Sequence, residues 1–305
     1  MLGVVRLKSL AKTSSTDFRG GNFFLKTLYS LFDIGTNASV CKRFAVRLWD
    51  RRSLLFEMTR REITDRYAGQ WFGWTWAALH PLAVVCIFIF LFTTVFNTRF
   101  PQNSNLPRDY STYLLSGLIP WLSMQAALSA SATALTSAPN LVKQALFPIE
   151  VLPARHVLAS LLPLAVGLAV LLLYMMMADG ALPISVVLLP VAVALHLVFI
   201  LGVSLALSCL GAFMRDVKDL IQVYLQIGTY IIPIVYLPGW VPDTLRPIVM
   251  ANPFGFFVTV YQDVLFYGSI VNPLYWLLAF LAAGASFLLG LRLFAKLQPY
   301  VADVV

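Results

Sequence analysis

The sequence predicts an all-α integral membrane protein. We expect six transmembrane helices per protomer, an N-terminal amphipathic interface helix, and outer re-entrant helices between spans five and six. Hydrophobic residues make up 59% of the 305 residues and charged residues only 12%, whereas a soluble domain has about 25% charged residues. Several apolar runs reach about 20 residues, the length that crosses a bilayer as a helix. Of the 22 Lys and Arg residues, 13 precede Trp71, and basic residues accumulate on the cytoplasmic side of membrane proteins.

Composition also excludes several classes. The net charge of +8 comes largely from residues next to the first span, where anionic lipid headgroups are the expected partner, so we expect no nucleic acid. Cys41, Cys86 and Cys209 have no metal-ligand spacing and predict no metal site. The chain lacks the phosphate-binding pattern G-x-x-x-x-G-K-[ST], so if transport is driven by ATP, another chain must supply the ATPase.

The N-terminal part divides into two segments. Residues 1–47 are basic and mixed, and predict a loosely ordered cytoplasmic arm with a short surface helix. Residues 48–70 have a helical composition, and Leu55 and Met58 lie on one face at helical spacing, although Glu62 intrudes on that face. A helix lying along the inner membrane surface fits this pattern. A plain solvated helix is the alternative.

Six spans follow within a transmembrane domain at 71–297, and a short cytoplasmic tail at 298–305 ends the chain. We expect the spans at 76–97, 113–137, 156–178, 184–213, 220–237 and 273–294. The segment 238–272 is apolar but broken by prolines. Two short pieces of it, near 244–250 and 254–266, are expected to enter the outer leaflet and return, which is tolerated where protein or a water-filled cavity surrounds the backbone.

Charge sets the orientation of this arrangement. Nineteen basic residues fall on segments expected inside, and only Arg99, Arg108 and Arg246 fall outside. This asymmetry predicts a multi-pass protein of the cytoplasmic (inner) membrane with both termini in the cytoplasm. The cluster Trp71, Trp74 and Trp76 is expected at the membrane boundary, where an aromatic ring with a polar edge acts as an anchor.

Uncharged polar residues form stripes on spans two and five. Each stripe follows one helical face, and an unsatisfied amide in hydrocarbon costs several kcal/mol, so both stripes must face protein or water. Two interpretations stay open: helix–helix packing, or the lining of a path suited to neutral, hydroxyl-rich sugars. The channel-lining candidates are Gln125, Ser129, Thr133, Gln222, Tyr224, Gln226, Thr229 and Tyr230.

Titratable groups are scarce in the expected spans. His196 lies near the middle of span four and is a candidate by default, but a neutral histidine bonded to a neighbouring helix is favoured. We therefore predict no catalytic residue in this chain.

Five stretches, in the same order, resemble ABC-type polysaccharide exporter permeases, which export O-antigen, teichoic acid and capsule. The longest is Asp-Arg-Tyr-Ala-Gly-Gln-Trp-Phe-Gly-Trp-Thr-Trp at 65–76, ahead of the first span. The others are Gly-Leu-Ile-Pro-Trp at 117–121, Leu-Val-Lys-Gln-Ala-Leu-Phe-Pro at 141–148, Phe-Met-Arg-Asp-Val-Lys-Asp-Leu at 213–220, and Asn-Pro at 252–253. The likeness covers 48–297. The arm is longer than expected for the family, and Gln262-Asp263 stands where the family often has Arg-Asp.

This resemblance implies a homodimer bound to two ABC ATPase subunits. A lipid-linked polysaccharide would pass through a channel between the protomers, and the ATPase would hold the ATP and Mg. The ATPase-coupling residues would be Arg60, Arg66, Lys143, Phe147 and Pro148, the substrate-access residues Trp71, Trp74 and Trp76, and the outer-gate residues Tyr236, Trp240, Asn252, Pro253 and Asp263.

Two other functions remain as alternatives. A membrane-embedded transferase acting on a lipid-linked sugar could use Asp243 and Asp263, although solvated loop charges are the favoured interpretation of both. A secondary carrier is the third hypothesis, and the absence of charge inside the expected spans weighs against it.

Overall fold

The structure is a computed structural model that describes residues 34–66, 68–95, 107–144 and 146–305, without the side chains of 34–38, Trp74 and Thr93. The predicted surface helix of the arm and most of the first outer loop lie outside the described residues. The chain divides into two units, 1–46 and 47–305.

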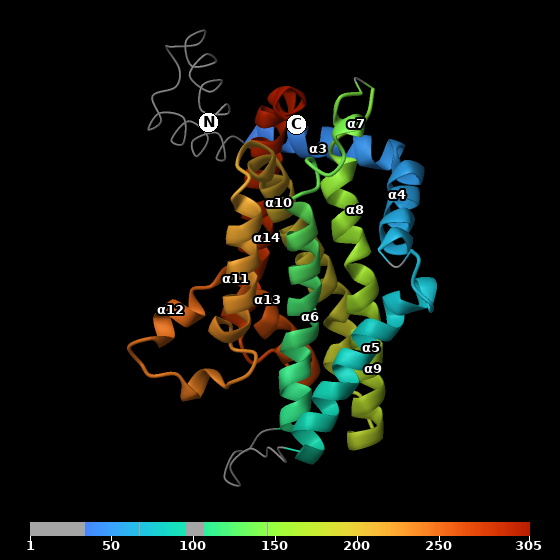
Figure 1. The fold of residues 1–305 in the computed structure, drawn as a ribbon. Helices are drawn as coiled ribbons and strands as arrows, with labels where there is room; N and C mark the ends of the chain where they lie inside the picture. The colour runs from blue at the N-terminus through green and yellow to red at the C-terminus, as the bar shows by residue number, and fades with distance from the viewer. Residues whose placement is uncertain (1–33, 67, 96–106, 145) are drawn as a thin grey trace. The chain divides into compact units, whose positions relative to one another are not determined.

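The described residues form helices and contain no strand. In chain order the elements are α3 (Ile34–Asp50), α4 (Arg52–Asp65), η1 (Gly73–Thr75), α5 (Trp76–Phe90), η2 (Leu91–Val95), α6 (Tyr110–Ser131), α7 (Pro139–Val142), α8 (Val151–Ala159), α9 (Leu161–Asp179), η3 (Ile184–Leu188), α10 (Leu189–Phe213), α11 (Val217–Ile231), η4 (Pro238–Trp240), α12 (Arg246–Met250), α13 (Pro253–Gln262), η5 (Asp263–Tyr267) and α14 (Pro273–Val304) (Figure 1).

Among the described residues, three helical segments are long and apolar enough to cross a membrane: Val151–Asp179, Ile184–Phe213 and Pro273–Val304, with 29, 30 and 32 residues. The shorter helix at Trp76–Phe90 is also apolar. The helical elements of the described residues, several of them long and apolar, are consistent with the predicted all-α integral membrane fold. The count of six spans and the re-entrant helices stay predictions.

Helix α6 is the centre of the second unit. In the ribbon of Figure 1 it runs lengthwise through the bundle. It contacts α5, α8, α9, α10, α11 and α13, and most of its side chains are buried. Asp109 caps its N-terminus by accepting a hydrogen bond from the Thr112 backbone N–H at 3.3 Å, which satisfies a donor that the first turn leaves unpaired. Pro120 inside the helix removes one backbone donor, and the surrounding helices hold the element in place.

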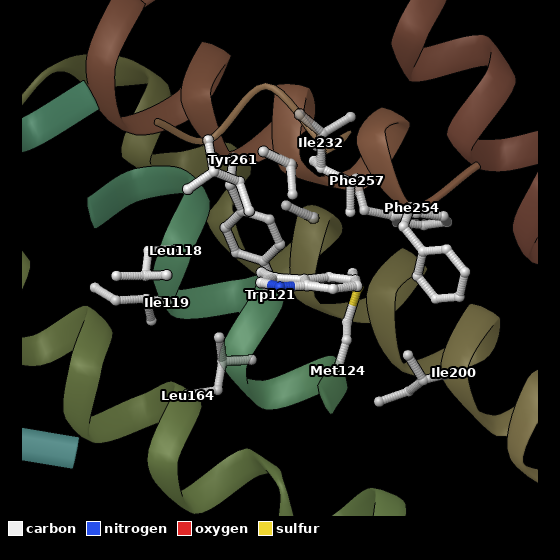
Figure 2. Packing of buried hydrophobic residues seen from close by; sticks show 14 of the residues in the cluster. Leu118, Ile119, Trp121, Met124, Leu164, Ile200, Ile232, Phe254, Phe257 and Tyr261 are labelled. Atoms are coloured by element: carbon white, nitrogen blue, oxygen red, sulfur yellow. The ribbon is translucent and has the colours of Figure 1, made fainter. Parts of the chain in front are cut away.

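Trp121 occupies the middle of the core (Figure 2). Its side chain is fully buried and meets Phe254 edge to face, with 5.7 Å between ring centroids. Phe254 and Phe257 come from α13 and also pack against Phe199 of α10, at centroid distances of 5.1 and 4.4 Å. Three elements that are far apart in sequence are therefore joined through one aromatic cluster.

Two glycines let α10 and α14 cross at backbone contact. A Cβ on Gly202 would lie 2.3 Å from the backbone carbon of Ser286, and a Cβ on Gly290 would lie 1.9 Å from the backbone oxygen of Gly202. Small residues at such crossings let the helix axes approach, and packing then stabilises the pair inside a membrane.

Several predicted span boundaries differ from the helices. Helix α6 covers Tyr110–Ser131 rather than 113–137, and α14 continues to Val304 rather than ending at 294. The third span begins at Val151 rather than 156, so Arg155 lies inside α8. Pro153 does not prevent this, because the first turn of a helix has no partner for its N–H groups. The fifth helix ends at Ile231 rather than 237, since Pro233 forces Ile232 into an extended conformation with ψ of 139°. Helices α12 and α13 fall where the two short segments were expected.

Candidate functional site

The predicted polar stripes of α6 and α11 contact one another. The Gln125 side-chain amide donates to the Leu225 carbonyl at 2.7 Å and to the Thr229 hydroxyl at 3.2 Å. The Trp121 indole N–H donates to the same hydroxyl at 2.8 Å. Gln222 donates to Ser129 one turn further along. These residues therefore form a hydrogen-bonded seam within one protomer.

The opposite face of α11 presents a different surface. Leu220, Val223, Gln226, Ile227 and Tyr230 are exposed, and Tyr230 has 74% of its surface accessible. Apolar, amide and phenol groups alternate along this face at helical spacing. The interpretation that Gln226 and Tyr230 line a path for a transported molecule therefore stays open.

The remaining channel-lining candidates, Thr133 and Tyr224, lie outside the hydrogen-bonded seam. Thr133 donates to the carbonyl of Ala130 in its own helix at 3.3 Å. Tyr224 lies 3.5 Å from the Asn252 side-chain oxygen, and that oxygen also caps α13 by accepting from the Phe254 N–H at 3.1 Å. A channel-lining candidate and an outer-gate candidate are thus in contact.

Asp263 is buried, with only 1% of its surface accessible, so its interpretation as a solvated loop charge is wrong. Its carboxylate accepts hydrogen bonds from the Asn272 backbone N–H at 3.1 Å, the Asn272 amide at 3.0 Å and the Trp276 indole at 3.0 Å. Asn272 precedes the first turn of α14, where negative charge is favoured by the helix dipole. The carboxylate anchors α14 to the end of α13 and gives no support to a transferase.

Other outer-gate candidates lie on the surface or at element ends. Trp240 is exposed, Pro253 occupies the first turn of α13, and the Tyr236 hydroxyl donates to the Ile231 carbonyl. Asp243 is a surface charge, with 89% of its side chain accessible and Arg246 at 2.9 Å.

The segment between α11 and η4 is fixed through its backbone oxygens. Tyr110 donates to the Val235 carbonyl. Tyr113 donates to the carbonyls of Pro233 at 3.1 Å and Tyr236 at 2.9 Å. Gln262 donates to the Pro233 carbonyl at 3.0 Å. Side chains thus give partners to backbone carbonyl groups of a segment that follows the helix and lies outside regular secondary structure.

A charged cluster joins α4 to α8. The Glu62 carboxylate lies 3.3 Å from the His156 ring nitrogen Nδ1, 3.6 Å from Arg155 Nε and 3.3 Å from an Arg66 guanidinium nitrogen. The nearby His156 ring and the guanidinium groups of Arg155 and Arg66 outweigh the effect of burial and lower the pKa of Glu62 to about 2. Glu62 therefore stays ionised at any pH that a cell encounters.

The other coupling and access candidates are mostly at the surface. Trp71 is fully exposed, and the ring of Trp76 meets Phe72 edge to face at 5.6 Å. The Trp74 side chain lies outside the described residues. The exposed residues of this set are Arg60, Arg66, Lys143 and Trp71, and the half-buried ones are Phe147, Pro148 and Trp76.

His196 is fully buried, and its Nδ1 lies 3.5 Å from the Tyr261 hydroxyl. Among the described residues no group of three or more His, Cys, Asp or Glu side chains is placed to hold a metal ion. The favoured interpretation of His196 as a neutral residue bonded to a neighbouring helix agrees with this geometry.

Comparison with known proteins identifies the family. The ABC-2 type transporter model matches residues 53–266, and the chain belongs to this family. It is therefore a multi-pass membrane permease and not itself an enzyme. The resemblance to ABC-type polysaccharide exporter permeases is confirmed.

Several curated relatives support this assignment. The chain is 28% identical over 227 residues to the O-antigen export system permease protein RfbA of Myxococcus xanthus, and the aligned region covers 73% of this chain and 84% of the relative. It is 23% identical over 253 residues to the protein of the same name from Klebsiella pneumoniae, covering 83% and 95%. It is also 22% identical over 211 residues to the polysialic acid transport protein KpsM of Escherichia coli, covering 69% and 80%.

Sequence reasoning missed two structural roles. Asp263 was assigned to an outer gate, but its burial depends on Asn272 and Trp276, which follow it by 9 and 13 residues. Glu62 was noted only as a misplaced charge on an apolar face. The sequence does carry a signal for the role of Glu62. A charged residue on the face by which a helix packs is buried only when an opposite charge on the neighbouring element pairs with it.

Proposed function

We propose that this chain is the transmembrane subunit of an ATP-driven exporter. It moves a lipid-linked polysaccharide, such as O-antigen, capsule or a teichoic-acid-like polymer, from the cytoplasm across the inner membrane. Two copies of the chain form a homodimer, and two ABC ATPase subunits bind the ATP and Mg. Both termini lie in the cytoplasm.

Helix lengths support six spans per protomer. At 1.5 Å per residue, α5 with η2 and α6 each reach about 30 Å, which matches the hydrocarbon thickness of a bilayer. Helix α11 has 15 residues and reaches only about 22 Å. The segment after it, with α12 and α13, completes the outer half as re-entrant structure.

The observation that carries the proposal is the exposed face of α11. It presents Gln226 and Tyr230 beside apolar residues in a chain whose relatives are named as export permeases. An exposed amide in a membrane span needs a polar environment. A channel between two protomers gives it one, and a polymer rich in hydroxyl groups can bond to amides and pack on phenol rings.

Purification from the native membrane tests this function. We expect a soluble subunit with a phosphate-binding loop to co-purify in a fixed ratio, and its ATP hydrolysis to require this chain. A strain that lacks the chain should accumulate lipid-linked polymer in the cytoplasm. Normal surface polysaccharide in that strain, or a lone dimer without an ATPase, would contradict the proposal.

The variant Gln226→Leu distinguishes two roles for Gln226, the lining of a transport path and contact with lipid or a packed helix. We expect this change to lower export without changing the amount of protein in the membrane, because Gln226 is exposed in the protomer. The matched variant Gln125→Leu breaks two hydrogen bonds of the seam and should instead lower the amount of folded protein. The measurements are surface polysaccharide and membrane abundance. Full export with Gln226→Leu would assign that residue to lipid contact or packing.

A further inference from the structure

Helix α4 meets the bundle through a charged contact and through half-buried apolar side chains, those of Leu54, Leu55, Met58 and Ile63. Thr59 is its only buried side chain among those described, and Phe56 points outward with most of its surface accessible. Beyond its own helix, the ion-pair contacts of α4 that the structure describes are those of Glu62 with Arg155 and His156 of α8. The Glu57–Arg61 pair at 2.7 Å stays within the helix.

The space beside this contact is incompletely filled. A cavity of about 460 Å³ is lined by Arg155 of α8 and six α4 residues: Leu54, Glu57, Met58, Arg61, Glu62 and Asp65. Close-packed side chains normally fix the angle between two helices. Here the cavity removes part of that packing, so the charged contact has a larger share in setting the angle.

Two glycines lie in the link from α4 to α5. Gly69 and Gly73 have φ angles of +77° and +51°, a region that favours glycine, and a Cβ on either would have no described neighbour within 4 Å. Side-chain packing therefore does not restrain the backbone at these two positions. Among the described elements, α8 is the bundle helix that α4 contacts most.

Arg155 and His156 make that contact specific. Their side chains are only 16% and 5% accessible, so loss of the Glu62 charge leaves a buried guanidinium without its counter-charge. Breaking a buried pair by removing one partner is strongly unfavourable. On the other side, α8 continues through Ser160 into α9, and Ser123 of α6 bonds the Ser160 carbonyl at 2.9 Å. A change in α4 would thus reach α6 and α9.

We propose that Glu62 is a positioning residue that anchors helix α4 to α8 through Arg155 and His156, and so transmits the position of α4 to the transmembrane bundle. This inference rests on the proposed function, since it assigns to one carboxylate the mechanical link between the surface helix and the channel.

The docking of α4 is measured directly by cysteine labelling. Thr59→Cys is introduced into a chain with Cys41 and Cys86 replaced by serine, and a membrane-impermeant maleimide is applied to inside-out vesicles. We expect Glu62→Gln to speed labelling by about tenfold, as for a docking equilibrium shifted by about 1.4 kcal/mol. Glu57→Gln is the matched control on the same helix and should leave the rate unchanged, because Glu57 pairs only within α4.

Transport is measured in the same variants as polymer exported per ATP hydrolysed. Glu62→Gln should lower this ratio severalfold while the amount of complex stays constant, and Glu62→Asp, which keeps the charge, should restore part of it. Equal labelling and equal export in Glu62→Gln and Glu57→Gln would overturn the inference. If Glu62→Gln fails to accumulate, Arg155→Gln removes the α8 partner instead and must give the same two changes.

Failure of the inference can be told from failure of the proposed function. The labelling rate reports the α4–α8 contact whether or not the chain exports anything. A wild-type complex without ATP-dependent export contradicts the proposed function. The labelling result then still shows whether Glu62 anchors α4 to α8. A wild-type complex that exports, with unchanged labelling in Glu62→Gln, contradicts only the inference.

Discussion

Adding one methyl group at Gly202 or Gly290 is expected to remove most of the folded protein from the membrane. An alanine Cβ would lie 2.3 Å from a backbone carbon at Gly202, and 1.9 Å from a backbone oxygen at Gly290. Because the obstructing atoms belong to the main chain, no side-chain rotation relieves the clash, and α10 and α14 must separate. We expect a loss of about 3 kcal/mol or more, measured as membrane abundance and thermal stability in detergent.

Gly284 provides a control within α14. A Cβ there would have no described neighbour within 4 Å, so Gly284→Ala should leave stability unchanged or raise it by about 0.5–1 kcal/mol, the helix preference of alanine over glycine. The two kinds of site are thus predicted to respond with opposite signs to the same chemical change. Equal abundance of Gly290→Ala and Gly284→Ala would show that the helices do not cross as described.

Asp263→Ala is expected to have the second large effect. It removes the acceptor of three hydrogen bonds from Asn272 and Trp276 and leaves these donors without that partner in a half-buried environment. Hydrogen bonds to a charged group and the desolvation of unsatisfied donors together make a loss on the order of 3 kcal/mol reasonable. Thermal stability and membrane abundance should both fall.

Asp243→Ala is the matched change at an exposed aspartate, and we expect no effect because its side chain is 89% accessible. Asp263→Asn adds a functional test, since it keeps the shape but replaces one acceptor by a donor. A structural anchor predicts that export falls only in proportion to the amount of folded protein. A fully stable Asp263→Asn protein that lost a sugar-transfer activity would instead revive the transferase hypothesis.

Long helices could be predicted from the sequence because their signals are local. The fourth span was expected at 184–213, and one continuous helical segment, Ile184–Phe213, occupies that range. Apolar length and flanking charge determine such a segment without reference to its neighbours. The boundary at Ile231 also has a local cause in Pro233, but the apolar residues after the proline concealed it.

Partners across the fold could not be predicted in the same way. The stripe on α6 was visible in the sequence, but that Gln125 bonds Thr229 depends on how α11 packs. The Glu62 contact likewise joins residues 93 and 94 positions apart, and periodicity carries no information about pairs at that separation. Burial of Asp263 follows from the return of the chain into α14, which no local pattern specifies.

The bonds that hold the segment after α11 all end on main-chain oxygens, of Pro233, Val235 and Tyr236. Every residue type offers the same oxygen, so the identity of the side chains on the accepting segment is nearly irrelevant to these bonds. The constraint rests on the donors, Tyr110, Tyr113 and Gln262. Reporter groups can therefore be attached to the accepting segment to follow its movement during transport, provided that the donors are left intact.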